Sequence, residues 1–547
     1  RLRIGHIGHN PSGDRAAQLF GLTRRHSSGY DLEIELLFSS LWGRSMTQRL
    51  RIYSAGIVIG LAWTGTVHAG QTVAADHSGV TFTKDIAPIL QRSCQICHRP
   101  DSVAPMSLLT YQEARPWARA MKMRTSVGPR AGVMPPWYVE ENIGIQRYKN
   151  NPSLSDEEIT KIGAWADNGA PEGNPADLPP PLNWSTAAWS IGEPDLITVL
   201  PDITVKGDAP DWWGEIETTP VGNTKDRYVA ALEFKEINNV VPAARSRDTV
   251  GGRFIYHHMI WSTQVVGDDG EQDEERQRGT TTGWPVHEVG RNADIFDAKA
   301  GRLLSANSSV VSNSLHLHSN GRDTTGHLEI AWKFHPEGYE PEFRRVGRGL
   351  GNALDIDIRP MLANQELHAY TVLQQNQKIS TFEPHLHAPG QRMCLEAIWG
   401  MNIETLTCVG YDHNWVRTYE YEDDYAPLLP KGTILHIVGY MDNSPTNRNI
   451  PDPRNWQGSG NRSVANMFID LGLGVELSDE QFIAEMAERR ERLGLGPNDH
   501  TLGCPLCPFD DLALPEEYDR RGRRTSQDQE DTEDDAGEAT ATEPTNQ

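Results

Sequence analysis

The sequence is poor in positive charge and in cysteine. Lysine and arginine number 51 against 75 aspartate and glutamate residues, so the formal net charge is -24. A balance this acidic argues against nucleic acid or an anionic membrane as a partner. The 547 residues include only six cysteines, and the mean hydropathy of -0.54 describes a soluble protein. The length leaves room for about three domains.

The sequence also lacks an apolar run suited to crossing a membrane. The uncharged, mostly apolar run at 52–67 is too short and wrongly flanked for a spanning helix. It follows a short basic segment and ends in Val67-His68-Ala69, at the positions that a signal peptidase reads. We therefore expect a secretory signal peptide at 46–69 and a mature periplasmic protein beginning near Gly70. Residues 1–45 are polar and patternless, as expected of a non-native extension. No cysteine follows the cleavage site, so we expect no lipid anchor.

The strongest local signal is Cys94-Gln95-Ile96-Cys97-His98. Two thiols three residues apart, followed at once by a histidine, form the attachment pattern of c-type haem. Cys94 and Cys97 would bind the two vinyl groups, and His98 would bind the iron. A redox pair would not need the histidine, and no second cysteine pair at zinc-finger spacing lies nearby. The pattern predicts one covalent haem c.

A methionine is the expected sixth ligand of that haem. Met134 lies in a loop that the following prolines hold extended. Met106 is too close to His98 to reach round the haem, and Met121 and Met123 lie on a helix face. We therefore favour Met134.

The spacing of apolar residues predicts the domain organisation. Helical periodicity with capping signals predicts a small all-α cytochrome c domain around the haem pattern. Short β-rich segments separated by turn residues then predict two all-β sandwich domains of the jelly-roll type. The expected order is the cytochrome c domain at 78–174, a stiff Pro-rich linker at 175–190, the β-domains at 191–360 and 361–476, a helix with a Cys-x-x-Cys segment at 477–520, and a disordered acidic tail at 521–547.

The β-rich region contains several histidines that occur in close pairs. A pair separated by one residue lies on one face of a strand, where it can clamp copper or zinc. A single pair could equally be a buried structural pair or a chance surface pair. Three pairs in one exported β-rich region favour metal binding. The pairs are His257 with His258, His316 with His318, and His385 with His387.

Several stretches carry a family resemblance. Besides the paired histidines, they are Glu383-Pro384-His385-Leu386-His387, Tyr411-Asp412-His413-Asn414-Trp415, Leu429-Pro430-Lys431-Gly432-Thr433 and Asp442-Asn443-Ser444. Together they resemble the copper type II, ascorbate-dependent monooxygenases, the family of the peptidylglycine α-hydroxylating and dopamine β-monooxygenases. The resemblance covers roughly 195–473. The haem segment resembles the cytochrome modules often fused ahead of such enzymes. The resemblance implies two β-sandwiches, each with one copper ion, and an open cleft between them.

The resemblance also implies ligands for the first copper. His257 and His258 match its paired ligands. His318 best matches the third ligand, because a polar turn follows it. His316 is an extra histidine that could exchange roles with His318. Met259 fits strand packing.

For the second, oxygen-binding copper, the resemblance implies His385, His387 and Met467, which are then the catalytic positions. The thioether of Met467 favours Cu(I). Asn466 and Phe468 flank it, where the family commonly has glutamate and methionine. Met467 thus matches the family's thioether ligand, and the residues on either side of it depart from the family pattern.

The implied chemistry is hydroxylation of a C–H bond of a small molecule or peptide by O2, with one electron drawn from each copper. The fused haem would relay electrons from a periplasmic donor at high effective concentration. Two other functions stay open. One is an electron-transfer or complex subunit whose β-domains bind partners, and the other is a copper-handling protein.

The remaining cysteines form two local pairs, as suits an oxidising compartment. Cys394 and Cys408 flank a turn at 400–402, so they could face each other across a hairpin as a disulfide. Cys504 and Cys507 lack the histidine of a haem site. A tight disulfide is expected there, with metal binding or redox exchange as alternatives.

Overall fold

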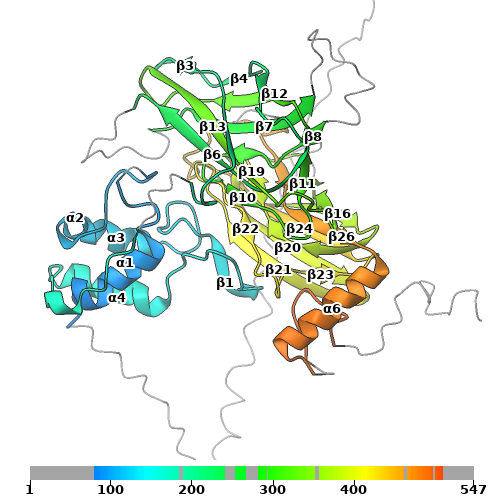
Figure 1. The fold of residues 1–547 in the computed structure, drawn as a ribbon. Coiled ribbons are helices and arrows are strands. Elements are labelled where there is room, and N and C mark those ends of the chain that lie inside the picture. Colours follow the sequence, from blue (N-terminus) through cyan, green and yellow to red (C-terminus); the bar gives the residue numbers. More distant parts are fainter. Residues whose placement is uncertain are drawn as a thin grey trace, which may run out of the picture. The chain divides into compact units, whose positions relative to one another are not determined.

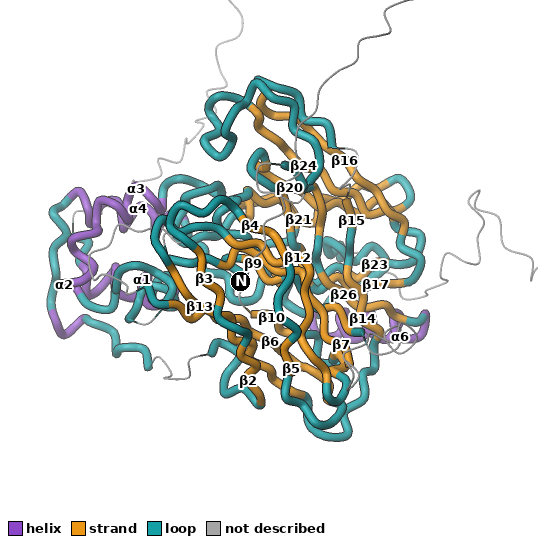
Figure 2. The backbone as a smooth tube through the Cα atoms, turned by 90° about the horizontal axis from the view of Figure 1, so that it is seen from above, coloured by secondary structure: helices purple, strands orange, loops and turns teal. Residues whose placement is uncertain are grey.

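A computed structural model describes residues 79–100, 102–183, 189–240, 253–265, 281–291, 293–351, 356–460, 465–496 and 499–508. The expected N-terminal extension at 1–45, the signal peptide at 46–69 and the acidic tail at 521–547 lie outside these residues. Strands dominate what is described, as Figure 2 shows in orange.

The segment around the cysteine pattern contains short helices and one strand. The longest helix, α4, has 12 residues. It begins at a capping box in which the hydroxyl of Ser155 accepts from the Glu158 amide and the Glu158 carboxylate accepts from the Ser155 amide. The elements are η1 (Phe82–Ile86), α1 (Ala87–Ser93), α2 (Tyr111–Ala114), η2 (Arg115–Trp117), α3 (Ala118–Thr125), β1 (Val139–Gly144), α4 (Asp156–Asp167) and η3 (Pro175–Asp177).

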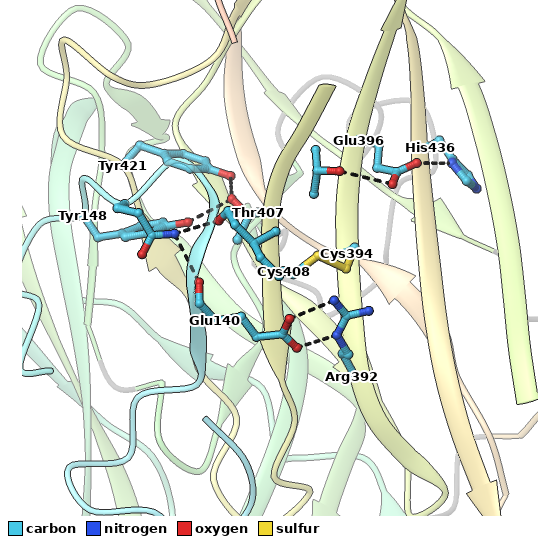
Figure 3. The surroundings of a disulfide bond; sticks show 12 residues. Glu140, Tyr148, Arg392, Cys394, Glu396, Thr407, Cys408, Tyr421 and His436 are labelled. Carbon is cyan, nitrogen blue, oxygen red and sulfur yellow. Dashed lines mark hydrogen bonds and ion pairs between the residues drawn. A yellow bond between two sulfur atoms is a disulfide. The ribbon is translucent and has the colours of Figure 1, made fainter. Parts of the chain in front are cut away.

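The prediction of a separate, small all-α domain at 78–174 is wrong. Strand β1 pairs antiparallel with β21 (Asn402–Gly410), with Val139 opposite Val409. The guanidinium of Arg392 binds the Glu140 carboxylate, which fastens β1 to the same sheet (Figure 3). Trp137 and Tyr148, which flank β1, lie in the apolar core of that sheet. The stretch around β1 therefore belongs to the core of that sheet, whereas the helices of the segment pack around a core of their own, which includes Phe82 and Trp165. Spacing along the sequence could not reveal a strand partner more than 250 residues away.

The first β-rich part, drawn mainly in green in Figure 1, contains two six-stranded sheets. One has the order β10-β6-β13-β2, with β11 and β3 added, and the other has the order β4-β12-β7-β8, with β5 and β9 added. Apolar side chains of both sheets form one core, which includes Trp261 and Trp332. The strands are β2 (Leu196–Val199), β3 (Ile203–Val205), β4 (Trp212–Gly214), β5 (Thr219–Pro220), β6 (Arg227–Asn238), β7 (Tyr256–Val265), β8 (Thr282–Gly283), β9 (His287–Glu288), β10 (Ala293–Ile295), β11 (Arg302–Leu304), β12 (Ser308–Leu317) and β13 (Thr324–Phe334).

The second β-rich part is not the simple two-sheet sandwich that was predicted. A five-stranded sheet, β1-β21-β20-β24-β16, is accompanied by sheets of four, three and two strands. These are β14-β26-β17-β23, β15-β25-β19 and β18-β22. The further strands are β14 (Arg344–Gly347), β15 (Leu350–Gly351), β16 (Leu362–Val372), β17 (Asn376–Ile379), β18 (Thr381–Phe382), β19 (Pro384–Leu386), β20 (Gly390–Trp399), β22 (Tyr419–Glu420), β23 (Leu428–Leu429), β24 (Ile434–Asn443), β25 (Phe468–Asp470) and β26 (Leu473–Leu477).

A last helix, α6 (Asp479–Leu493), begins at a capping box on Ser478. Its pattern predicts Glu485 outward and Ile483 inward, and the structure has the reverse. Ile483 is 37% exposed, whereas Glu485 is buried between the ammonium groups of Lys299 and Lys378, at 2.8 and 3.4 Å. Two lysines on neighbouring elements make the buried carboxylate tolerable. No helix among the described residues has the length and apolar character needed to cross a membrane.

Both of the remaining cysteine pairs form disulfides. Cys394 and Cys408 lie directly opposite each other in the β20–β21 ladder, with Cα atoms 4.1 Å apart (Figure 3). Cys504 and Cys507, which are three positions apart in the sequence, form the second disulfide. Both are fully buried beside α6. These are the pairs that the spacing predicts.

Candidate metal centre

A β-bulge places two consecutive histidines on one side of a strand. In the β7–β12 ladder, His258 pairs with His316 and Tyr256 pairs with Leu317, so His257 is an extra residue on β7. Consecutive side chains of a regular strand face opposite sides. The bulge breaks that alternation. The Nδ1 atoms of His257 and His258 lie 3.3 Å apart.

The facing end of β12 supplies two more histidines. His316 and His318 stack with ring centroids 5.1 Å apart, and the ring of His318 lies 4.2 Å from that of His257. Ligand nitrogens of His257, His316 and His318 all lie within 4.8 Å of one another. Sequence reasoning treated His316 as an alternative to His318, and the structure brings both to the same place.

The second β-rich part contributes the histidines of β19 and of a loop. The rings of His385 and His387 are 5.3 Å apart, and His385 lies 6.2 Å from His258 of the first part. His413, in the loop after β21, lies 5.3 Å from His257 and 6.1 Å from His387. The expected open cleft between the two histidine groups is therefore absent from the described chain. Seven histidines from both parts form one group, which we call the histidine cluster.

The histidine cluster surrounds a small cavity of about 10 Å³, the space of roughly one water molecule. Leu386, Tyr411 and Val416 close its walls, and the carboxylate of Glu288 reaches it. Its histidines are His257, His258, His316, His385, His387 and His413.

Burial favours the uncharged imidazole at five positions of the cluster. It lowers the pKa of His257 and His258 well below the ordinary value, and the neighbouring imidazoles add to the effect. The same causes lower the pKa of His318 and His413 to about 4 and that of His387 to about 2. Neutral imidazole is the form that binds a metal ion.

The nitrogens of the cluster fit a metal such as copper or zinc. The Nδ1 atoms of His316, His387 and His413 are buried without a hydrogen-bond partner among the described residues. Buried polar atoms are normally paired, so unpaired nitrogens on three residues that line one cavity favour a missing ligand. Imidazole suits copper and zinc alike.

Two carboxylates beside the cluster make contacts between the two β-rich parts. Glu288 of β9 forms an ion pair with Nδ1 of His385, and Arg291 forms one with Glu383. All four side chains are at most 7% exposed. Gly290, with φ +100°, allows this turn, because a Cβ there would lie 2.5 Å from the carbonyl oxygen of Val416. A carboxylate on the far nitrogen fixes the orientation of a ligating histidine.

Glu288 and His413 were missed as site residues. Glu288 stands alone in the sequence, with no spacing signal. His413 lies within the family-like stretch at 411–415, so that stretch was the available signal.

Met467 and Met259, the two methionines considered in the sequence analysis, lie in different surroundings. Met467 directly precedes β25, where His385 pairs with Ile469, so continuing the register sets Met467 opposite His387. Met467 is not among the described side chains that line the cavity. Its role as a ligand stays a prediction. Met259 is fully buried in the first core, as packing requires.

The haem pattern has features that fit a covalent haem. Cys94 and Cys97 are free thiols, whereas the other Cys-x-x-Cys forms a disulfide. Burial, with the nearby Cys97, raises the pKa of Cys94 to about 12. Nδ1 of His98 lies 3.2 Å from the carbonyl oxygen of Met106. The tautomer with Nδ1–H donating leaves Nε2 available for iron.

Met134 stays a prediction as the sixth ligand. Its side chain is 40% exposed, and its amide donates to the Arg124 carbonyl at 3.1 Å. Among the alternatives, Met121 is buried against the helices and Met123 is 67% exposed.

One short segment links the cysteine pattern to the histidine cluster. The Asp412 carboxylate accepts from the Gly132 amide at 3.2 Å, in the loop that carries Met134. His413 of the cluster and Arg417 belong to the same five-residue stretch, 413–417. The guanidinium of Arg417 lies 5.5 Å from the ring of Trp137. The charge of Arg417 also acts on Cys97, opposing the rise in pKa that burial causes there.

The chain matches no protein-family model and no curated protein.

Proposed function

We propose that the protein is a copper- and haem-dependent oxidoreductase, a monooxygenase that hydroxylates a C–H bond with O2. The observation that carries this proposal is the histidine cluster, in which residues with unpaired buried ring nitrogens line one cavity. The overall reaction places one oxygen atom of O2 in the C–H bond. It reduces the other atom to water with two electrons and two protons.

Each group of residues has a distinct role in this proposal. His257, His316 and His318 would hold one copper, and His385 and His387 another. Bound copper would supply reversible one-electron exchange and a place for O2. Glu288 keeps the proton of His385 on Nδ1, so that Nε2 is the nitrogen left for the metal. Leu386 and Val416 give the cavity apolar walls.

The thiols of Cys94 and Cys97, with Nε2 of His98, would hold the haem. The haem would accept single electrons from an external periplasmic donor. The contacts of Asp412 and Arg417 with the loop at 132–137 support a short route onward to the cluster.

The test is metal and electron counting on the full chain. Periplasmically produced protein should contain one haem and two copper ions per chain. Anaerobic titration with a chemical reductant should consume one electron for the haem and one for each copper. His385→Ala should lose copper and keep haem. His436→Ala is the matched control, because this histidine binds Glu396 outside the cluster. A chain without bound copper would refute the proposal.

One observation favours a second function, electron transfer without oxygenation. The cavity of about 10 Å³ is far below the roughly 300–1,000 Å³ of usual small-molecule sites. The fully reduced protein distinguishes the two, since a monooxygenase reacts with O2 and a pure electron carrier consumes it only slowly.

A further inference from the structure

We propose that Arg302 and Arg345 form a binding site for a phosphate group, at a place where the two β-rich parts meet. Arg302 lies on β11 of the first part, and Arg345 lies on β14 of the second. The proposal does not depend on the proposed function.

Both guanidinium groups lie over aromatic rings of the first part. The guanidinium carbon of Arg302 is 5.1 Å from the ring centre of Trp284. That of Arg345 is 4.1 Å from the ring centre of Phe296. The two rings are neighbours, with centroids 6.2 Å apart. Stacking restricts each guanidinium and leaves its edge, which carries the N–H groups, for an acceptor.

These two cations have no counter-ion of their own among the described residues. Neither guanidinium has a carboxylate within ion-pair distance there, and the buried Nη1 of Arg345 has no hydrogen-bond partner. The charge of Asp294 acts on both, but its carboxylate binds Arg291 at 2.7 Å. Burying a cation without a partner is costly. The pair therefore favours a bound anion.

The electrostatics of the pair lead to the same conclusion. Burial lowers the pKa of Arg302 to about 10. Burial and the charge of Arg302 together lower the pKa of Arg345 to about 9. Both groups therefore keep a positive charge at neutral pH and are close enough to repel each other. An anion between them would replace this repulsion by two attractions.

The donors favour phosphate over a carboxylate. Each guanidinium can donate two parallel N–H bonds to one anion, so the pair offers about four. Phosphate has enough oxygens to accept all of them, whereas a carboxylate has only two. A phosphate monoester also carries about −1.5 to −2 charges near pH 7, which balances the two guanidinium groups.

Equilibrium dialysis of the copper-free full chain against radiolabelled inorganic phosphate tests the site, with ionic strength held constant by chloride. One phosphate should bind per chain. Arg302→Gln and Arg345→Gln should each weaken binding about tenfold or more, because each removes charge-assisted hydrogen bonds. Arg344→Gln is the matched control, since this neighbour on β14 is 80% exposed and pairs with Glu476.

Two further measurements separate binding from folding. Near-UV circular dichroism reports whether each variant keeps its packing. Arg345→Lys keeps the charge but loses the fork of donors, so it should bind phosphate more weakly than the wild type. Methyl phosphate in the same dialysis distinguishes the sources of the ligand. Binding of the ester indicates a phosphate monoester, and binding of inorganic phosphate alone indicates the free ion.

Three results would overturn the proposal. One is the absence of saturable binding of either phosphate compound to the wild type. Another is wild-type affinity in both glutamine variants. The third is an equal loss in Arg344→Gln, because a general change in surface charge would then explain the effect.

Discussion

The carboxylate of Glu288, on β9, forms an ion pair with Nδ1 of His385, on β19, so the first β-rich part orients a histidine of the second. Both side chains are almost completely buried. This pair makes the geometry of the candidate metal centre depend on both parts at once.

Replacing that carboxylate should weaken metal binding. Glu288→Gln keeps the shape of the side chain but removes its charge, and loss of such partners typically costs about 10–100-fold in metal affinity. Competition with a copper chelator measures the change. Glu396→Gln is the matched control. The carboxylate of Glu396 lies 2.8 Å from Nδ1 of His436, and this pair is outside the histidine cluster. Equal losses in the two variants would contradict the assigned role.

Met134→Ala should abolish the sulfur-to-iron charge-transfer absorption of the oxidised haem protein. The reason is that no other thioether in that loop can replace it. Met123→Ala, in α3 and 67% exposed, should leave the band unchanged. Survival of the band in Met134→Ala would assign the sixth ligand elsewhere.

The two disulfides should differ in their contribution to stability. Their sequence separations are 14 and 3 residues. In the loop-entropy model, closing loops of these sizes adds about 3 and about 2 kcal/mol. The free energy of unfolding in urea should fall further for the Cys394→Ala/Cys408→Ala double variant than for Cys504→Ala/Cys507→Ala. The opposite order would show that native packing dominates both effects.

Stability should depend on pH through Glu236. Burial raises the pKa of Glu236 to about 7, although the amides of Ile255 and Tyr256 and the side chain of Asn238 donate to it. A carboxyl whose pKa is higher in the folded state favours folding only while protonated. Its contribution is fully present below pH 4.5 and disappears as the pH rises through 7. The loss is on the order of 3 kcal/mol.

Comparison with Glu236→Gln isolates this effect. The variant cannot ionise, so its stability relative to the wild type should improve between pH 5 and pH 8 in urea unfolding of metal-free protein. A difference that does not change with pH would show that Glu236 ionises normally.

Local signals predicted much of the fold, and pairing over long distances was beyond them. The capping sequence at Ser155 marked the start of α4, because both partners lie within four residues, and the apolar pattern at 478–493 marked α6. Strand β1 has no such signal, since its pairing with β21 depends on a distant segment. The segment that looked like a separate helical domain is joined to the β-rich core for that reason.

The candidate site shows the same limit. Paired histidines on strands were visible in the sequence, and the structure brings His257, His316 and His318 together. The bulge that turns His257 and His258 to one side depends on the register with β12. His413 lies in a loop and Glu288 in a two-residue strand. Neither element is long enough or regular enough to show a periodic pattern of side chains in the sequence.

The crossing ion pairs also determine how the gene can be divided. A truncation between the β-rich parts would leave Arg291 and Glu288 in one fragment and Glu383 and His385 in the other. Removing one partner of a buried ion pair typically costs about 3–5 kcal/mol, a large share of the stability of a domain. Neither fragment should accumulate as a soluble protein alone, and co-expression of the two should rescue both.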